Sequence, residues 1–301
     1  MSWLVGQNSA QQRLAERFRD LLRGPGILRL PGAHDALSAL MAKSVGFPAL
    51  YLSGGAYSAS RGWPDLGLIN STELAQRASD LVRATDLPLL VDVDTGYGGP
   101  LSAARAAREL AEAGVAAVQI EDQAMAKKCG HLDGKALVPA EELQAKILAI
   151  KSVAPSMLVA ARTDALAVEG IEGVIARSRV YLEAGADLIF PEALTCESEF
   201  RAVRAALPGP LLANMTEFGK TPYFSAEQFQ AWGYQVVLFP VSSLRVAGAA
   251  YRRLFAAIQA SGTTEPLLGE MLTRRELYEL LGYAGYERIG VRGPSRKEGA
   301  L

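Results

Sequence analysis

The chain contains little sulfur and little histidine. Among its 301 residues there are two cysteines, Cys129 and Cys196, and two histidines, His34 and His131. Two cysteines are too few for a disulfide framework, which excludes the small disulfide-rich secreted class and fits a reducing compartment. So few nitrogen and sulfur ligands also argue against a zinc site.

Excess charge and long hydrophobic runs are also missing. The formal net charge is −1, so nothing indicates nucleic acid or an anionic membrane as a partner. No apolar run approaches the roughly 18–20 residues of a membrane span. At the N-terminus, Leu14, Phe18, Leu21 and Leu22 form a helical stripe among charges instead of a signal peptide. We therefore expect a cytoplasmic protein, for which a small anionic substrate is still possible.

A short unit recurs along the chain: a helical stretch, often ending at a glycine, precedes a brief apolar run with a polar end. Such turn-bounded runs are typical of parallel strands covered on both faces. Helical patterns occupy 102–113, 140–153 and 171–184, and two more, 242–261 and 265–282, follow the last strand. The eight predicted strands are 27–30, 48–53, 87–94, 115–121, 157–162, 186–192, 210–214 and 234–240.

Eight βα units in about 250 residues predict an α/β fold of the (β/α)₈ TIM-barrel type. The alternative, a doubly wound sheet, would need fewer strands and a G-x-G-x-x-G loop after a strand, which the sequence lacks. We expect residues 1–301 to form a single barrel domain with an N-terminal helix and a C-terminal helical extension.

Acidic residues end the third predicted strand. Asp92 and Asp94 stand at positions i and i+2, so on a strand both would face the same side. Two neighbouring carboxylates repel each other unless a cation or proton intervenes, and hard oxygen ligands favour Mg²⁺ or Mn²⁺. The alternative is a helix cap beside a surface aspartate. Other predicted strand ends carry Ser53, Glu121, Arg162, Asp164, Glu192, Asn214, Thr216, Ser242 and Arg245.

The loop after the fourth strand is rich in cations. Lys127, Lys128 and His131 surround Cys129, and the run contains Gly130 and continues to Gly134 and Lys135. Such surroundings attract carboxylates and lower a thiol pKa. The alternative interpretation is a solvated basic loop with an incidental cysteine.

This loop resembles the K-[KR]-C-G-H signature of the isocitrate lyase/phosphoenolpyruvate mutase superfamily. Other segments, spread from about Gly32 to Glu287, are similar to its 2-methylisocitrate lyase branch. They are YLSGG at 51–55, PDLG at 64–67, DVDTG at 92–96, IED at 120–122, ARTDA at 161–165, FPE at 190–192, ANMTEFG at 213–219, and TR at 273–274 before ELYE at 276–279.

The resemblance implies a role for each matching residue. Asp92 and Asp94 would hold Mg²⁺ (or Mn²⁺), with Asp65 and Glu121 in the outer shell. Cys129 would be the catalytic acid, assisted by Lys127 and His131. Tyr51, two residues before Ser53, is a candidate base from its position alone. The implied substrate contacts are Ser53, Gly54, Gly55, Cys129, Gly130, Arg162, Glu192, Asn214, Met215, Thr216, Arg245 and Arg274.

The resemblance also implies a reaction and an assembly. The reaction is a retro-aldol type cleavage of 2-methylisocitrate, a tricarboxylate, to pyruvate and succinate in the 2-methylcitrate cycle of propionate catabolism. The assembly is a homotetramer in which the C-terminal helix is swapped between subunits. Lys128 stands where many members of the branch have arginine, whereas apolar Phe190, Leu238 and Pro240 favour a substrate with an added methyl group. The alternatives are an isocitrate lyase, an oxaloacetate decarboxylase-like enzyme, a phosphonate mutase, or a barrel that binds carboxylates without catalysis.

Overall fold

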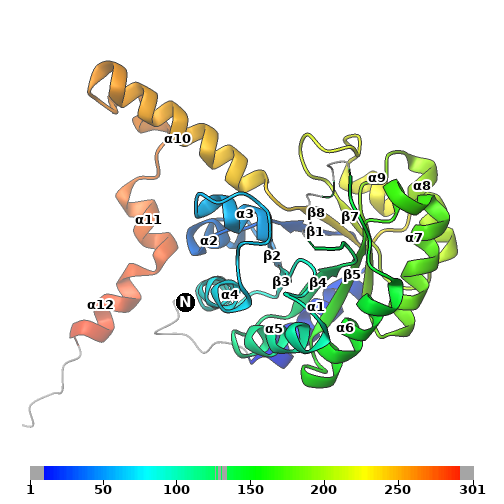
Figure 1. The fold of residues 1–301 in the computed structure, drawn as a ribbon. Coiled ribbons are helices and arrows are strands. Elements are labelled where there is room, and N and C mark those ends of the chain that lie inside the picture. Colours follow the sequence, from blue (N-terminus) through cyan, green and yellow to red (C-terminus); the bar gives the residue numbers. More distant parts are fainter. Residues whose placement is uncertain (1–9, 126, 128–129, 131–133, 292–301) are drawn as a thin grey trace, which may run out of the picture.

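Eight parallel strands surrounded by helices form a barrel in the computed structural model, which describes residues 10–125, 127, 130 and 134–291 (Figure 1). All eight predicted strands are confirmed, with ends that differ by at most two residues from the prediction. The strands are β1 (Leu28–Pro31), β2 (Leu50–Leu52), β3 (Leu89–Asp92), β4 (Ala117–Glu121), β5 (Leu158–Thr163), β6 (Leu188–Pro191), β7 (Leu212–Asn214) and β8 (Val236–Phe239).

Strand pairing closes the barrel in two segments. One segment runs in the order β2-β3-β4-β5-β6, and the other in the order β1-β8-β7. An isolated bridge between Gly32 and Tyr51 joins β1 to β2, and another between Ile189 and Leu211 joins β6 to β7. Closure on both sides confirms the TIM barrel and excludes the open doubly wound sheet.

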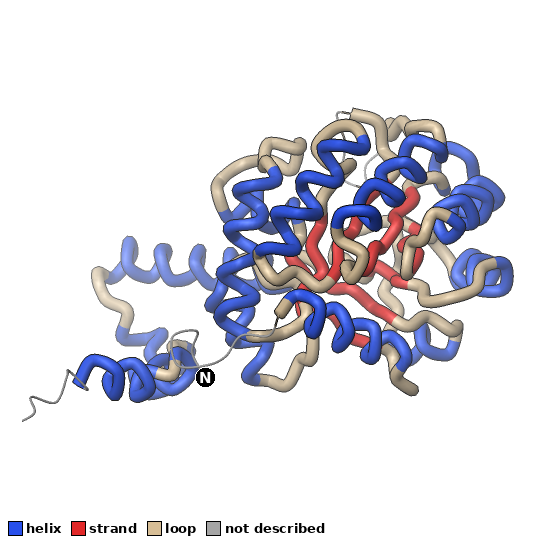
Figure 2. The backbone as a smooth tube through the Cα atoms, turned by 90° about the horizontal axis from the view of Figure 1, so that it is seen from below, coloured by secondary structure: helices blue, strands red, loops and turns tan. Residues whose placement is uncertain are grey.

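Helices cover the outside of the barrel (Figure 2). Several begin with reciprocal caps: Asp35, Asn70 and Ser225 each accept a bond from the backbone three residues later. At Gly170, φ is 70°, and the helix that contains it is kinked there. The covering helices are α2 (Ala36–Ser44), α3 (Gly54–Ser60), α4 (Ser71–Thr85), α5 (Pro100–Glu112), α6 (Ala140–Val153), α7 (Leu166–Glu183), α8 (Glu197–Ala206) and α9 (Ala226–Ala231).

The N-terminal end of the barrel is closed by α1 (Gln11–Arg23). Its apolar stripe, Leu14, Phe18 and Leu22, is buried as the sequence pattern predicts. Its polar side chains bind backbone carbonyls of the loops that precede strands: Arg17 donates to Asp86 O at 2.8 Å and Gln11 to Val115 O at 3.1 Å. The helix therefore seals this end with apolar contacts and satisfied hydrogen bonds.

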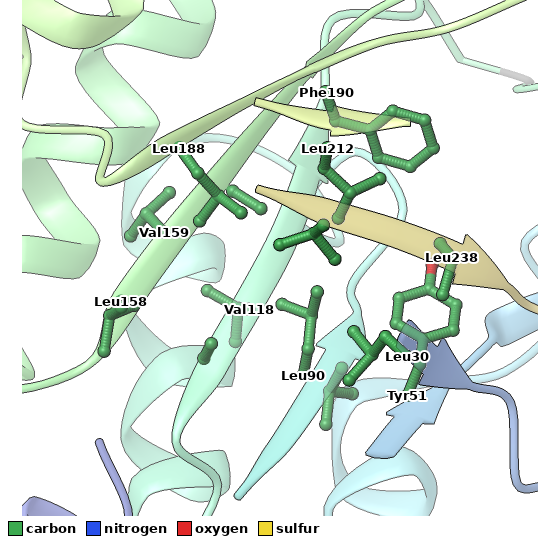
Figure 3. Packing of buried hydrophobic residues seen from close by; sticks show 14 of the residues in the cluster. Leu30, Tyr51, Leu90, Val118, Leu158, Val159, Leu188, Phe190, Leu212 and Leu238 are labelled. Atoms are coloured by element: carbon green, nitrogen blue, oxygen red, sulfur yellow. The ribbon is translucent and has the colours of Figure 1, made fainter. Parts of the chain in front are cut away.

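Buried hydrophobic side chains from all eight strands pack into one cluster (Figure 3). They include Leu30, Leu90, Val118 and Leu212, each at most 1% exposed. Interiors of this kind are packed cores and not pores. Tyr51, Phe190 and Leu238 also belong to this cluster, and they line the cavity described below.

The C-terminal helices extend away from the barrel (Figures 1 and 2). The prediction of one helix over 242–261 is confirmed by α10 (Ser242–Ser261), which has no buried residue within the described chain. The prediction of one helix over 265–282 is wrong. A 3₁₀ helix, η1 (Glu265–Glu270), ends before Thr273 caps α11 (Arg274–Leu281), and α12 (Tyr283–Val291) follows. Thr273 and Glu276 form a capping box, so a new helix must begin there.

Within the described part of the chain, no helix is both long enough and apolar enough to cross a bilayer.

Candidate active site

A cavity of about 320 Å³ opens at the carboxyl ends of the strands, where barrel enzymes place their active sites. Strand ends and the loops after them supply its lining, so residues far apart in sequence converge. A larger cavity of about 670 Å³, between α2, α4 and the C-terminal helices, contains none of the predicted residues. The predicted residues that line the smaller cavity are Tyr51, Ser53, Gly55, Asp65, Asp92, Glu121, Lys127, Gly130, Arg162, Glu192, Asn214, Thr216 and Arg245.

Asp92 and Asp94 converge, but not in the way the sequence predicted. Asp92 ends β3, whereas Asp94 lies beyond the strand with φ at 49°, so the expected common strand face is wrong. The left-handed turn at Asp94 brings this residue close to Asp92, and the Asp94 N–H donates to Asp92 Oδ1 at 3.1 Å. A Cβ added to Gly54 would lie 3.3 Å from both Asp92 Oδ2 and Asp94 Oδ1. The glycine therefore leaves room for the two carboxylates to meet.

Lys127 supplies positive charge to this acidic pair. Its Nζ lies 2.7 Å from Asp94 Oδ1 and 2.5 Å from Asp65 Oδ1. Burial and the neighbouring Asp92 raise the pKa of Asp94 to about 6, and Lys127 opposes that rise. Burial alone would lower the pKa of Lys127, but Asp94 and Asp92 hold it above its ordinary value. The lysine is therefore a permanent cation among acidic groups.

The donor set around Asp92 fits a hard cation. Asp92 and Asp94 are each at most 9% exposed, and nearby Glu121 has a buried Oε1 without a hydrogen-bond partner. In the described ranges, no group of three or more acidic, histidine or cysteine side chains is arranged to enclose a metal. Two carboxylates with an open side suit Mg²⁺, which keeps several waters and uses substrate oxygens. The same set does not suit zinc.

Arg162, near the end of β5, supplies a second cation to the site. Its Nε and Nη2 pair with Asp164 at 2.9 and 3.1 Å, and its Nη1 lies 3.3 Å from Glu121 Oε2. The guanidinium also lies over the Phe190 ring, 5.4 Å from its centroid. A guanidinium held by several contacts keeps one orientation, with its remaining surface facing the cavity.

Gly130 packs directly against this arginine. A Cβ at position 130 would lie 2.4 Å from Arg162 Nη2 and 2.6 Å from Glu192 Cγ, closer than atoms can approach. Only glycine fits there without movement of Arg162 or Glu192. The predicted residues Lys128, Cys129 and His131 lie outside the described residues.

A polar relay below the cavity escaped the sequence reasoning. Tyr51 donates its phenol proton to Gln119 Oε1, and Gln119 Nε2 donates to Asp92 Oδ1 at 3.1 Å. Burial, with the charge of Asp92, raises the pKa of Tyr51 well above its ordinary value, so the phenol is a proton donor in this state. The available signal was Gln119 itself, a lone polar residue inside an apolar strand.

The far side of the cavity combines amide, hydroxyl and apolar groups. Asn214 Nδ2 donates to Glu192 Oε2 at 3.2 Å, while Asn214 Oδ1 is buried without a partner. Phe190, Leu238 and Pro240 belong to the apolar part of the lining, together with Ala59, Val241 and Leu244. Met215 does not line the cavity. It is buried, and its sulfur accepts a bond from the Phe224 N–H.

The two predicted arginines near the C-terminus differ in position. Arg245 lines the cavity, where its Nη1 pairs with Glu217 Oε2 at 2.7 Å. Arg274 is exposed at the start of α11 and is not part of the cavity within one chain. The implied substrate contact of Arg274 therefore has no support from the single chain.

Comparisons with known proteins agree with this geometry. The family described as phosphoenolpyruvate phosphomutase matches residues 18–259. A 2-methylisocitrate lyase from Bacillus subtilis (strain 168) is 58% identical over 289 residues, which cover 96% of each chain.

Solved structures share the fold over nearly the whole chain. The crystal structure of 2,3-dimethylmalate lyase, described as a PEP mutase/isocitrate lyase superfamily member, matches with a TM-score of 0.87 and 34% identity, covering 98% of this chain and 100% of that one. A phosphonopyruvate hydrolase in complex with oxalate and Mg²⁺ matches with a TM-score of 0.83 and 26% identity, covering 92% and 98%.

Proposed function

Because the chain belongs to the PEP mutase/isocitrate lyase family, we propose that it is a 2-methylisocitrate lyase that cleaves its substrate to pyruvate and succinate. Its identity to the Bacillus subtilis lyase extends over almost the entire chain. In the cell, this activity would belong to the 2-methylcitrate cycle of propionate catabolism, in the cytoplasm.

The observation that carries the choice of substrate is the mixed lining of the cavity. Arg162 and Lys127 offer cations for carboxylates, while Phe190, Leu238 and Pro240 offer an apolar surface. A methyl group on the substrate would pack against this apolar surface, away from water. Isocitrate, which lacks that methyl group, would leave the space empty. One buried methyl group contributes only about 1–3 kcal/mol, so the preference should be finite.

The test is a side-by-side assay of 2-methylisocitrate and isocitrate, following release of the keto acid in the presence of Mg²⁺. We expect kcat/KM to be at least about 10-fold higher for 2-methylisocitrate, the effect of one well-placed methyl group. Equal or faster turnover of isocitrate would reject the substrate assignment while leaving the family unaffected.

We also propose that Asp92 and Asp94 hold Mg²⁺, with Mn²⁺ as a substitute and with Asp65 and Glu121 in the outer shell. The convergent carboxylates and the partnerless Glu121 Oε1 support this. The solved phosphonopyruvate hydrolase contains Mg²⁺ with oxalate. When bound, the ion supplies Lewis acidity to oxygen atoms of the substrate.

The remaining steps of the reaction are assigned to residues of the chain. A base removes the proton from the C2 hydroxyl, the C2–C3 bond breaks, and the electron pair moves onto the succinate fragment. Cys129 is proposed to protonate C3 of that fragment, and Lys127 and His131 would stabilise the thiolate that remains. Arg162 offsets the carboxylate charge throughout.

Tyr51 is the candidate base for this step. Tyr51 lines the cavity from β2, but its raised pKa makes it a poor proton acceptor in this state. Tyr51→Phe keeps the ring and removes the hydroxyl. A fall in kcat of at least about 10²-fold would support the role, and near-normal turnover would reject it.

We further propose a homotetramer in which the C-terminal helices are exchanged between subunits. This is supported by α10, which has no fully buried residue in the single chain and exposes Val246, Tyr251 and Phe255. An exchange would also offer Arg274 a neighbouring cavity. Phe255→Asp should dissociate the assembly in analytical ultracentrifugation. Leu101→Asp, which changes an exposed residue of α5, is the matched control. A wild-type monomer, or an unaffected tetramer in the variant, would contradict the proposal.

A further inference from the structure

Lys135 lies at the end of the loop that contains Lys127 and Gly130, and its ammonium is almost completely buried. Its side chain is 2% exposed, and its Nζ donates to Gly130 O at 2.6 Å and to Asp164 Oδ1 at 2.9 Å. A buried lysine is tolerated only when it is paired and hydrogen-bonded, as it is here. The contact joins the loop to the end of β5.

Asp164 is the residue that transmits this contact to the site. Its side chain is fully buried and also accepts two hydrogen bonds from Arg162, at 2.9 and 3.1 Å. Its Oδ1 therefore serves Lys135 and Arg162 together. Its backbone is anchored as well, because its N–H donates to Asp122 Oδ1 at 2.9 Å. Burial opposes ionisation, but Arg162 and Lys135 lower the pKa of Asp164, so the carboxylate stays charged.

The anchor of Asp164 is itself rigid. Asp122 is fully buried and also accepts bonds from Thr163 Oγ1 at 2.7 Å and from Tyr181 OH at 2.8 Å. The base of the loop is paired as well: Gln123 and Leu137 form an antiparallel bridge, beside the bond from Ala124 N to Ala136 O at 2.8 Å. Asp164 is therefore a fixed point, and Lys135 connects Gly130 to it.

We propose that Lys135 is a positioning residue for the reaction: it fixes the backbone of Gly130 against Arg162 and Glu192, and it shares Asp164 with Arg162 so that the guanidinium keeps one orientation. Arg162 has competing acidic neighbours, with Glu121 at 3.3 Å and Glu192 at 3.6 Å. Loss of Lys135 would leave Asp164 with one cation and the Gly130 carbonyl without its donor. A displacement of about 1 Å in such a site lowers rates by roughly 10²-fold.

The inference rests on the proposed function only for the choice of substrate. The variant is Lys135→Met, which keeps the length of the side chain and removes the charge and its bonds. We expect kcat to fall by about 10–100-fold, the usual effect of losing a residue that orients a catalytic group. The far-UV circular dichroism spectrum should stay unchanged.

Lys151 offers a matched control at the other end of the barrel. Its Nζ also bonds one carboxylate and one carbonyl, Asp187 Oδ2 at 2.5 Å and Met157 O at 3.0 Å, although its side chain is 22% exposed. Lys151→Met should lower the melting temperature but leave kcat near the wild-type value. Equal kcat values for the two variants would overturn the proposal, because Lys135 would then have only a structural role.

Three further variants, Lys135→Gln, Asp164→Asn and the double variant of Lys135→Met with Asp164→Asn, keep the test decisive. If Lys135→Met does not fold, Lys135→Gln keeps a donor for the Gly130 carbonyl but not the charge, and its kcat should still fall by about 10-fold. Wild-type turnover of Lys135→Gln would reject the charge argument. Asp164→Asn combined with Lys135→Met should lose little more than the larger single loss, because both act through one contact. Additive losses would mean independent roles.

The experiment also separates the two hypotheses. If the wild type cleaves isocitrate or 2,3-dimethylmalate and not 2-methylisocitrate, the proposed function fails. The five variants are then compared on the substrate that is cleaved, and the role of Lys135 is decided by the same ratios.

Discussion

The two ends of the barrel differ in what they bury. At the N-terminal end, α1 inserts Leu14, Phe18 and Leu22, and its polar side chains bind backbone carbonyls. At the carboxyl end, charged groups are buried instead, and acids outnumber bases in the described part of the site. The acids are Asp92, Asp94, Glu121, Asp164 and Glu192, and the bases are Lys127, Lys135 and Arg162.

The difference shows how one fold separates stability from activity. Apolar burial at one end stabilises the chain without any ligand. Excess buried carboxylate at the other end is unfavourable until a cation or proton joins it. We therefore expect substitutions at the two ends to affect different measurements, and the following predictions test that separation.

The largest expected effect is on stability, at the N-terminal end. Phe18→Ala should lower the free energy of unfolding by about 3–5 kcal/mol, since it removes a fully buried ring. The kcat of the folded enzyme should not change. Urea denaturation measures the first quantity and a steady-state assay the second. Leu101→Ala, at an 87% exposed position, is the control and should change stability by less than about 0.5 kcal/mol. A large loss of kcat in Phe18→Ala would break the comparison.

Asp92→Asn should instead lower kcat and leave stability intact. Loss of a carboxylate that is proposed to hold the metal should lower kcat by about 10²–10³-fold, the scale of one lost electrostatic stabiliser. Thermal stability should hold or rise, because one acid is removed from a crowded group. In the wild type, EDTA should abolish turnover, and Mg²⁺ or Mn²⁺ should restore it. Full activity of the variant in chelator would refute the metal assignment.

Cys129→Ser tests the proposed acid. A hydroxyl is a far weaker acid than a thiol, so kcat should fall by at least about 10²-fold while substrate binding changes little. Iodoacetamide should inactivate the wild type, and succinate should protect it. Cys196→Ser removes the other thiol, which is exposed at the start of α8, and should leave both results unchanged. Near-normal turnover of Cys129→Ser would make His131 the next candidate.

The smallest expected effect concerns substrate selectivity. Leu238→Val removes one methylene from the apolar wall, a change of about 0.8 kcal/mol in contact with a substrate methyl group. The ratio of kcat/KM for 2-methylisocitrate over isocitrate should therefore fall by a few-fold. Steady-state assays of both substrates give this ratio. An unchanged or increased ratio would show that Leu238 does not contact the methyl group.

Sequence patterns predicted the barrel well, because covered parallel strands leave short apolar runs between glycines, and all eight were found. They failed where conformation depends on one residue or on distant contacts. Nothing in the sequence shows that Asp94 adopts a left-handed turn, since aspartate does so only in particular contexts. The pair of Lys135 and Asp164 joins residues 29 positions apart and exists only once the loop meets β5. Gln119 was missed for a different reason, since its polarity within an apolar strand was visible in the sequence but was not used.

The two junctions between the strand segments have a consequence for hydrogen exchange. Each junction rests on one isolated bridge, Gly32 with Tyr51 and Ile189 with Leu211. Backbone amides beside such sparse pairing, those of Ala33 and Ile189, should exchange with solvent before those of β4 and β5. The first junction lies near Ser53, which follows β2. The second junction lies between β6, which Glu192 follows, and β7, which ends at Asn214. A bound substrate that contacts these residues would span both junctions. Binding should therefore slow deuterium uptake by the backbone amides of both junctions.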